Sequence, residues 1–139
     1  MHIRTLTTAD IDVLLCLWRQ VPGFGLGPDD EPERVAGFLT RNPTTCLGLF
    51  IQDRLAGSVL DGYDGRRGYL YHLAVHPSLQ GNGYGKDLIN GVTEAFLALD
   101  AKNMRLFVYA DNRRAREFYR RQGWRERGDL VVVGWNMAE

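Results

Sequence analysis

The stretch Gln80-Gly81-Asn82-Gly83-Tyr84-Gly85-Lys86 lies between a strand-like segment and a helix-like segment, and it constrains the fold more than any other part of the chain. Its three alternating glycines leave peptide N–H groups uncovered and allow backbone conformations that other residues resist. The first amides of the helix that follows have no partner inside the helix and carry partial positive charge. Such a loop is suited to hold a phosphate or pyrophosphate, so we expect the backbone to bind a phosphorylated cofactor.

Hydrophobic periodicity on both sides of this loop predicts an α/β fold with a mixed sheet, in the order β-α-α-β-β-β-α-β-α-β. After the loop, Leu88, Val92 and Phe96 share one helical face, which is typical of a helix packed on a sheet. Thr8 is expected to cap the first helix, and Asp30 the second. The predicted strands cover residues 1–6, 45–52, 55–62, 68–76, 104–110 and 129–137, and the predicted helices cover residues 8–21, 30–41, 88–99 and 112–122.

The composition is that of an ordinary globular protein. The chain has 139 residues, of which 45% are apolar and 24% charged, which predicts one domain over residues 1–139. Its formal net charge is +0, and its arginine-rich segment, residues 113–121, has helical spacing typical of a solvated helix face, so no nucleic-acid partner is expected. We expect no membrane segment, no metal site and a cytoplasmic location. Cys16 and Cys46 are interpreted as buried thiols in a reducing compartment.

Two familiar phosphate-binding loops do not fit the spacing. The P-loop needs a glycine five residues before its Gly-Lys pair and a Ser or Thr after it, but this chain has Gln80 and Asp87 there. The dinucleotide fingerprint needs a third glycine three residues after its second, and counting from Gly81 and Gly83 that position is Lys86. A nucleotide triphosphate or a dinucleotide is therefore not the expected ligand.

Two blocks of sequence fit a third pattern. Residues 80–85 resemble the Gln/Arg-x-x-Gly-x-Gly/Ala signature of the GNAT acyltransferase superfamily, and residues 73–77, Leu-Ala-Val-His-Pro, look like the end of that family's fourth strand. Residues 112–124 are similar to its Asn-x-x-Ala-x-x-Phe-Tyr-x-x-x-Gly-aromatic segment. With the element order, the resemblance covers nearly the whole chain. It implies a GNAT-like fold, in which helices flank a central, mostly antiparallel sheet whose fourth and fifth strands splay apart.

The resemblance also implies that acetyl-CoA binds in the cleft between those two strands. Carried over by position, backbone groups of Leu73 and Val75 would meet the pantetheine arm and the thioester carbonyl. Asn112 would contact the pantetheine arm, and Ala115 and Phe118 would line that side. The backbone amides expected to hold the pyrophosphate belong to Gln80, Gly81, Asn82, Gly83, Tyr84, Gly85 and Lys86.

Acetyl transfer to an amine requires a neutral nucleophile, and neutralising a lysine-like amine at pH 7 costs roughly 4–5 kcal/mol. The glutamates that act as the base in two branches of the family correspond here to Tyr69 and Phe107, so neither carboxylate is present. Tyr69 and Tyr71 share a strand face and could order a proton-relaying water or simply pack, and Tyr71 is the relay candidate. An amine that arrives already neutral would need no base. His72 is expected on the opposite face, as a core or hydrogen-bonding residue. The resemblance implies that Tyr119 is the acid that protonates the leaving thiolate.

The sequence leaves two classes of acceptor possible, a small-molecule amine and a peptide amine. Acidic residues before the second helix, namely Asp29, Asp30, Glu31 and Glu33, could attract a cationic amine, although helix capping explains them better. Asp61 and Asp64 are expected in a turn. No Cys or Ser lies beside a base in a nucleophilic pattern, so direct attack of the amine on acetyl-CoA is expected. The alternatives are a non-catalytic acyl-CoA-binding module and an interaction domain with a structural glycine loop. The last strand could pair across a homodimer.

Overall fold

The computed structural model describes residues 1–137 of the chain. The chain divides into two compact units, Met1–Phe107 and a smaller unit that begins at Val108. The first contains the whole sheet, and the second contains one α-helix. A single domain over residues 1–139 stays a prediction. Within the described part of the chain, no helix combines the length and the apolar character needed to cross a membrane.

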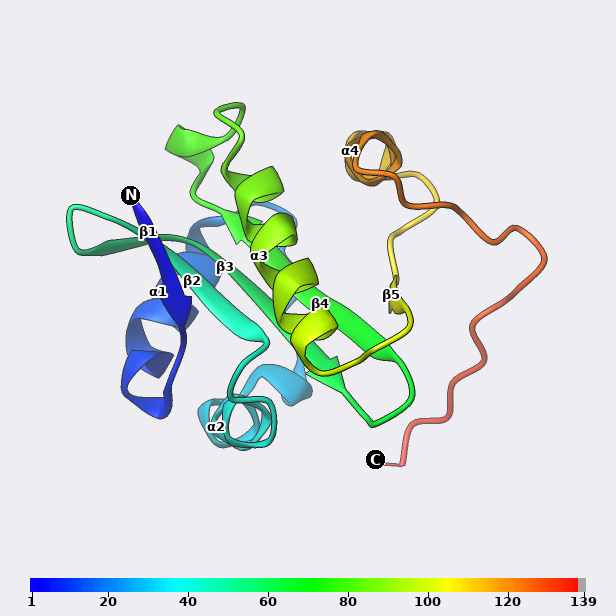
Figure 1. Cartoon of the computed structure of the whole chain (residues 1–139), viewed down its shortest axis with the longest axis horizontal. Helices are drawn as coiled ribbons and strands as arrows, with labels where there is room; N and C mark the ends of the chain where they lie inside the picture. Colours follow the sequence, from blue (N-terminus) through cyan, green and yellow to red (C-terminus); the bar gives the residue numbers. More distant parts are fainter. Residues whose placement is uncertain (138–139) are drawn as a thin grey trace. The chain divides into compact units, whose positions relative to one another are not determined.

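The sheet of the first unit has five strands in the order β1-β2-β3-β4-β5 (Figure 1). Neighbouring strands are antiparallel from β1 to β4, and β4 and β5 are parallel. This is the mixed, mostly antiparallel sheet that the sequence predicts. The strands are β1 (His2–Thr5), β2 (Cys46–Ile51), β3 (Arg54–Tyr63), β4 (Gly68–Val75) and β5 (Met104–Leu106).

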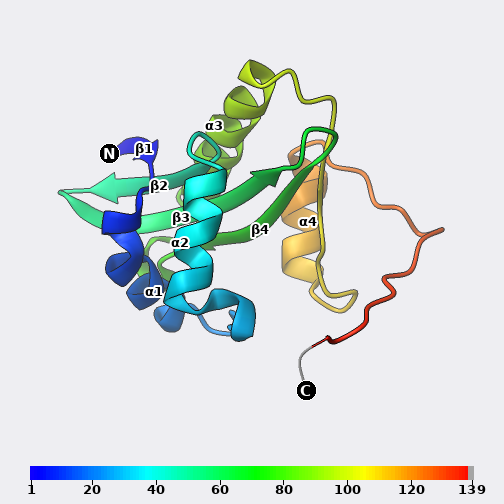
Figure 2. The ribbon, with the colours of Figure 1, turned by 90° about the horizontal axis from the view of Figure 1, so that it is seen from below.

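Helices cover both faces of this sheet (Figure 2). The helices α1 (Ile11–Gln20) and α2 (Pro32–Arg41) lie on one face, and α3 (Tyr84–Ala98) packs on the other. Short 3-10 turns precede each of them: η1 (Thr8–Asp10), η2 (Pro28–Asp30) and η3 (Pro77–Leu79). The predicted Thr8 cap of the first helix is not found: Thr7 caps η1, where its side chain accepts from the amide of Ala9, and α1 itself has no side-chain capping bond.

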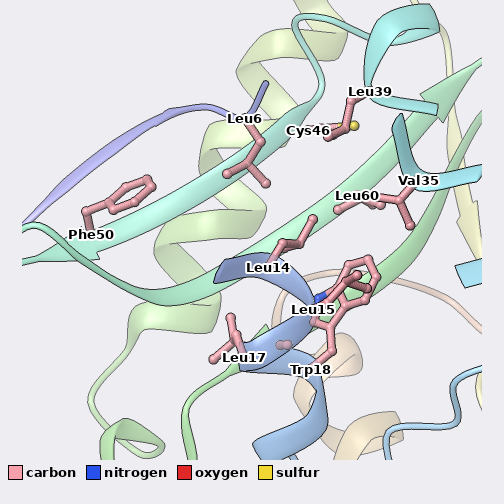
Figure 3. Close-up of a cluster of buried hydrophobic side chains, with 11 residues drawn as sticks. Leu6, Leu14, Leu15, Leu17, Trp18, Val35, Leu39, Cys46, Phe50 and Leu60 are labelled. Carbon is pink, nitrogen blue, oxygen red and sulfur yellow. The ribbon is translucent and has the colours of Figure 1, made fainter. Parts of the chain in front are cut away.

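A large cluster of buried side chains lies between α1, α2 and the sheet (Figure 3), and buried residues of α3 such as Leu88 and Val92 pack on the other face. Leu14 and Trp18 on α1 are 0% exposed, as their helical spacing predicts. Burying one such side chain stabilises the fold by about 1.5–3 kcal/mol. The Trp18 Nε1–H donates to Ser58 Oγ on β3 at 3.0 Å, so the indole is held by a hydrogen bond as well as by packing. Cys46 is buried in this core as predicted, but Cys16 is exposed, contrary to the prediction.

A β-bulge changes which way β4 presents its side chains. Leu60 of β3 pairs with His72, but the next residue, Asp61, pairs with Leu70, so Tyr71 is an extra residue in β4. The extra residue resets the two-residue alternation of the strand. His72 therefore packs on Trp18, on the face covered by α1 and α2, and the prediction that it faces away from Tyr71 is wrong.

The strand β5 is shorter than predicted, and this opens an edge of β4. It pairs with β4 only through Gly68–Met104, Tyr69–Arg105 and Leu70–Leu106. Among the described residues, residues 71–75 of β4 have no strand partner on that side. The sheet therefore has the diverging fourth and fifth strands that the resemblance implies.

The second unit contains α4 (Arg113–Arg121), which begins one residue after its predicted cap. The Asn112 Oδ1 accepts from the Ala115 amide at 3.1 Å, and Gly123, with a φ of 94°, closes the helix as predicted. The strand predicted over residues 129–137 is absent from the structure. A strand needs a backbone partner, and the part of the second unit that the structure describes contains no other strand to supply one.

Candidate functional site

The glycine loop has the conformation that an anion-binding loop requires. Gly81 and Gly83 have φ values of 85° and 83°, in the left-handed region that side chains disfavour. A Cβ atom at either position would meet nothing within 4 Å, so the space in front of the loop is open. The loop is therefore shaped by backbone conformation and leaves room for a ligand against its peptide groups.

Two polar side chains hold the loop in place from within. The Gln80 Nε2 donates to the Val75 carbonyl at 3.0 Å, which ties the loop to the end of β4. The Asn82 Nδ2 donates to the Leu79 carbonyl at 2.9 Å. Because these side chains are used to build the loop, it is the backbone that faces outward.

The amides at the start of α3 add to this donor set. Gly83 is the N-cap, and the Asp87 amide is the first to donate along the helix, to the Gly83 carbonyl at 3.1 Å. The amides of Tyr84, Gly85 and Lys86 precede it and have no partner within the helix. Together with the helix dipole, they make a site suited to a pyrophosphate.

The open edge of β4 supplies a second set of backbone groups. The His76 amide donates to the Ala56 carbonyl of β3 at 2.8 Å. Antiparallel pairs alternate between hydrogen-bonded and non-hydrogen-bonded, so the pairs formed by Val75 and Leu73 are of the second kind. The N–H and C=O groups of Leu73 and Val75 therefore point away from β3, toward the edge that β5 leaves open. This is the orientation that their predicted role requires.

On the face covered by α1 and α2, His72 forms a close pair with Asp30. The His72 Nε2 and the Asp30 Oδ1 are 2.6 Å apart, and both side chains are mostly buried, with 22% and 12% of their surface exposed. The imidazole packs against both Trp18 and Phe24, whose ring centroids are 4.7 and 4.8 Å away and whose rings stack on each other. The Asp30 Oδ2 accepts from the Gly27 amide at 2.9 Å. Asp30 thus caps η2 rather than α2, where no side-chain capping bond is present.

Tyr71 lies beside this pair at the bulge and is 52% exposed. Its ring meets the edge of Phe38 at 5.5 Å and lies 6.4 Å from Tyr69, which is 6.1 Å from Phe107. Burial raises the pKa of Tyr71, and the negative charge of nearby acidic groups, including Asp61, raises it further. The phenol is therefore protonated at neutral pH and can donate a hydrogen bond to a water or an acceptor.

Asp61, expected in a turn, lies instead inside β3 and is 0% exposed. Neither of its carboxylate oxygens has a hydrogen-bond partner among the described residues. Burial raises the pKa of Asp61 to about 8, an effect that the nearby Gly62 N–H opposes. Asp64 does lie in the β3–β4 turn, where its Oδ1 accepts from the backbone amides of Arg66 and Arg67. Sequence reasoning missed Asp61, since no local pattern marks its burial.

The second unit holds the other predicted site residues. Ala115, Phe118 and Tyr119 are half-buried on one side of α4. The Tyr119 ring lies 5.1 Å from Phe118 and 5.5 Å from Trp124, and the Trp124 amide donates to the Tyr119 carbonyl. The closing turn of α4 therefore fixes the tyrosine's position within its unit. No cluster of metal-ligating side chains is found within residues 1–137.

Comparisons with known proteins agree with this geometry. The model of the acetyltransferase (GNAT) family matches residues 13–124. The chain is similar to the acetyltransferase ECA0875 of Pectobacterium atrosepticum, with 29% identity over 140 residues that cover 100% of this chain and 97% of the relative. It is also similar to the acetyltransferase YE1169 of Yersinia enterocolitica, with 29% identity over 135 residues that cover 96% and 94%. The crystal structure of PaiA N-acetyltransferase from Thermoplasma acidophilum in complex with coenzyme A has a similar fold, with a TM-score of 0.78, 18% identity and 87% of each chain covered.

Proposed function

Because the chain belongs to the GNAT family of acetyltransferases, we propose that it transfers an acetyl group from acetyl-CoA directly to an amine acceptor. The chain is an acetyl-CoA-dependent acyltransferase, as its family and its relatives show. Family membership favours an enzyme over a non-catalytic acyl-CoA-binding module or an interaction domain. We propose three further points: that the amine attacks acetyl-CoA directly, which residues assist the attack, and which class of amine accepts the acetyl group.

The observation that carries the proposal is the set of outward-facing backbone donors on the first unit. The glycine loop and the start of α3 offer amides for a pyrophosphate, and the open edge of β4 offers groups for an extended arm. In the proposal, the amides of residues 80–86 hold the pyrophosphate and the backbone of Leu73 holds the pantetheine arm. The proposal also assigns cofactor contacts to Asn112, Ala115 and Phe118, as the resemblance implies.

The chemistry then follows from charge development on the thioester. The Val75 N–H would stabilise the oxygen of the tetrahedral intermediate, and one such aimed donor is typically worth about 3 kcal/mol. Tyr119 would give a proton to the coenzyme A sulfur as the C–S bond breaks. Tyr71 would order the water that relays a proton from the amine. With no acyl-enzyme, the acceptor amine itself forms the new C–N bond.

The acceptor end of the site is best suited to a small-molecule or peptide amine. Aromatic side chains of the first unit line the face beside β4, and Asp30 places a carboxylate there. Such a surface favours a cationic amine over a polyanion, so no nucleic acid is proposed as a partner. The proposal includes a cytoplasmic location, where acetyl-CoA is available and where free thiols such as Cys16 and Cys46 persist. A homodimer stays part of the proposal.

Two measurements on the purified protein test this function. Acetyl-CoA is expected to raise the melting temperature, because a ligand that binds only the folded state stabilises it. Release of free coenzyme A thiol is then followed with acetyl-CoA and a panel of amines. A thermal shift without thiol release from any amine would support the acyl-CoA-binding alternative, and the absence of both would support the structural glycine loop.

A further inference from the structure

We propose that His72, held by Asp30, is the general base that deprotonates the acceptor amine. This inference rests on the proposed function and completes it, since the positions that hold the base in related branches are Tyr69 and Phe107 here. The pair comes from β4 and η2, which are far apart in sequence and meet only in the fold. It adjoins the stretch of β4 that presents its backbone to the open edge.

Asp30 imposes one tautomer on the neutral His72 ring. A carboxylate 2.6 Å from Nε2 accepts a hydrogen bond, so the proton of the neutral imidazole resides on Nε2. The lone pair is then on Nδ1, for which no partner is found among the described residues. A histidine oriented by a carboxylate through one nitrogen and free at the other has the arrangement of a general base.

Packing and hydrogen bonds hold the His72 ring and Asp30 in place. The imidazole packs against the stacked rings of Trp18 and Phe24, and Trp18 is itself fixed by its hydrogen bond to Ser58. Asp30 is fixed in turn by the Gly27 amide. The ring therefore has one position, and a base held in one position loses little entropy when it meets its substrate.

The bulge at Tyr71 decides which face of the sheet His72 occupies. Without the extra residue, His72 would lie on the other face of the sheet, against α3. With it, Tyr71 and His72 lie on the same face, next to each other in the chain and beside the open edge of β4. A bulge of this kind commonly redirects a functional side chain.

The proton balance of the reaction is as follows. One proton of the acceptor ammonium passes to His72 Nδ1, directly or through the water at Tyr71, and the imidazolium is stabilised by the Asp30 carboxylate. The neutral amine attacks the thioester carbonyl, so the C–N bond forms and the C–S bond breaks. The coenzyme A sulfur takes a proton from Tyr119, which regains one from the amide nitrogen as that nitrogen loses its second proton. The imidazolium then releases its proton to water.

The test is chemical rescue of His72→Ala with acetyl-CoA and four amine probes: benzylamine, tyramine, glycinamide and lysine. The variant is expected to lose about 10²- to 10⁴-fold in kcat with any amine that the wild type acetylates, because the base is gone. Added imidazole can occupy the space that the His72 ring vacates beside Trp18 and Phe24, and it should restore turnover. The restored rate should increase with the basicity of substituted imidazoles, which a purely structural cavity filler would not show.

Matched variants separate the pair from its neighbours. Asp30→Asn removes the charge and keeps one acceptor oxygen, for Nε2 or for the Gly27 amide, so kcat should fall about tenfold or more while the KM for acetyl-CoA is unchanged. Asp29→Asn changes the adjacent exposed carboxylate and should leave kcat at the wild-type value. Equal turnover in wild type and His72→Ala, or a loss that no imidazole rescues, overturns the base assignment and leaves the acetyltransferase intact.

A readout without turnover distinguishes failure of this inference from failure of the proposed function. Long-range ¹⁵N NMR of the wild-type protein should show, for the neutral form of His72, Nε2 protonated and Nδ1 bearing the lone pair. The opposite tautomer overturns the inference whether or not the protein acetylates an amine. Absence of thiol release by the wild type with every probe overturns the proposed function, and the base assignment with it.

Discussion

Asp61→Asn should remove a pH dependence from the stability of the fold. The carboxyl of Asp61 is 0% exposed and has no hydrogen-bond partner among the described residues. Burial raises its pKa from 3.8 to about 8. The group is therefore neutral in the folded protein at pH 7 and ionised in the unfolded chain, which makes ionisation of Asp61 oppose folding.

The size of the effect follows from the two pKa values. A raised pKa means that the contribution of Asp61 to stability is fully present below the unfolded pKa of 3.8 and is lost as the pH rises through about 8. Each pH unit in this window removes about 1.4 kcal/mol from the free energy of unfolding. The loss is on the order of 4 kcal/mol at pH 7, a large part of the ~5–15 kcal/mol that holds a typical domain together.

The assay is urea unfolding of wild type and Asp61→Asn at several pH values between 5 and 7.5. The difference in unfolding free energy, variant minus wild type, should grow by about 1.4 kcal/mol per pH unit in favour of the variant. The pKa of Asp10 is shifted the other way, because the Arg4 guanidinium lowers it. Its contribution to stability is therefore lost only in more acid solution, and it cancels in the difference between the two proteins. Asp61→Leu should give the same slope. Parallel curves for wild type and both variants would refute the reasoning, because they would mean that Asp61 ionises in the fold as it does in water.

Two further predictions concern the proposed site. Tyr119→Phe should lower kcat by about 100-fold or more while calorimetry gives an unchanged Kd for acetyl-CoA, since only the proton donor is lost; undiminished turnover with all active acceptors would exclude the acid role. Gly83→Val should weaken acetyl-CoA binding about 10- to 100-fold, because a φ of 83° costs a branched residue about 1–3 kcal/mol and the loop relaxes out of its binding conformation. Gly65→Val is the matched control: it imposes similar strain at a φ of 94° in the β3–β4 turn and should lower stability but not affinity. A folded Gly83→Val protein with wild-type affinity would show that the loop does not contact the cofactor.

The parts of the fold encoded in local sequence were predictable. The glycine loop is recognisable because Gly81 and Gly83 occupy positions with positive φ, and the helix after it because its apolar residues recur every three or four positions. The four antiparallel strands follow from apolar runs separated by turns. Each of these features depends on a residue and its near neighbours, so a single sequence is enough to predict them.

Features that depend on pairing between distant segments were not predictable. The bulge at Tyr71 arises from the register of β3 and β4, which the sequence of one strand does not reveal. A prediction from strict two-residue alternation therefore placed His72 on the wrong face of the sheet. The contact between His72 and Asp30 joins residues 42 positions apart. The capping pattern predicts that Asp30 caps α2, whereas its carboxylate binds the Gly27 amide and the His72 imidazole. No periodicity reports contacts of this kind.

The last strand shows the limit of composition. Residues 131–133 are three consecutive valines, which favour a β-strand, yet the structure has no strand there. A strand exists only when its backbone groups are paired. Sequence alone indicates a preference for the extended conformation but not whether a partner is present, so a prediction from propensity fails where no partner is supplied.

Titration of ¹⁵N-labelled protein with acetyl-CoA, followed through backbone amide resonances, tests most directly whether the loop and the start of α3 bind the diphosphate. Saturable shifts are expected for the amides of Gly81, Gly83 and Lys86, with the Gly65 amide of the β3–β4 turn unchanged. Saturable binding of acetyl-CoA that leaves the three loop amides unmoved would contradict the account, because the coenzyme would then be held elsewhere on the protein.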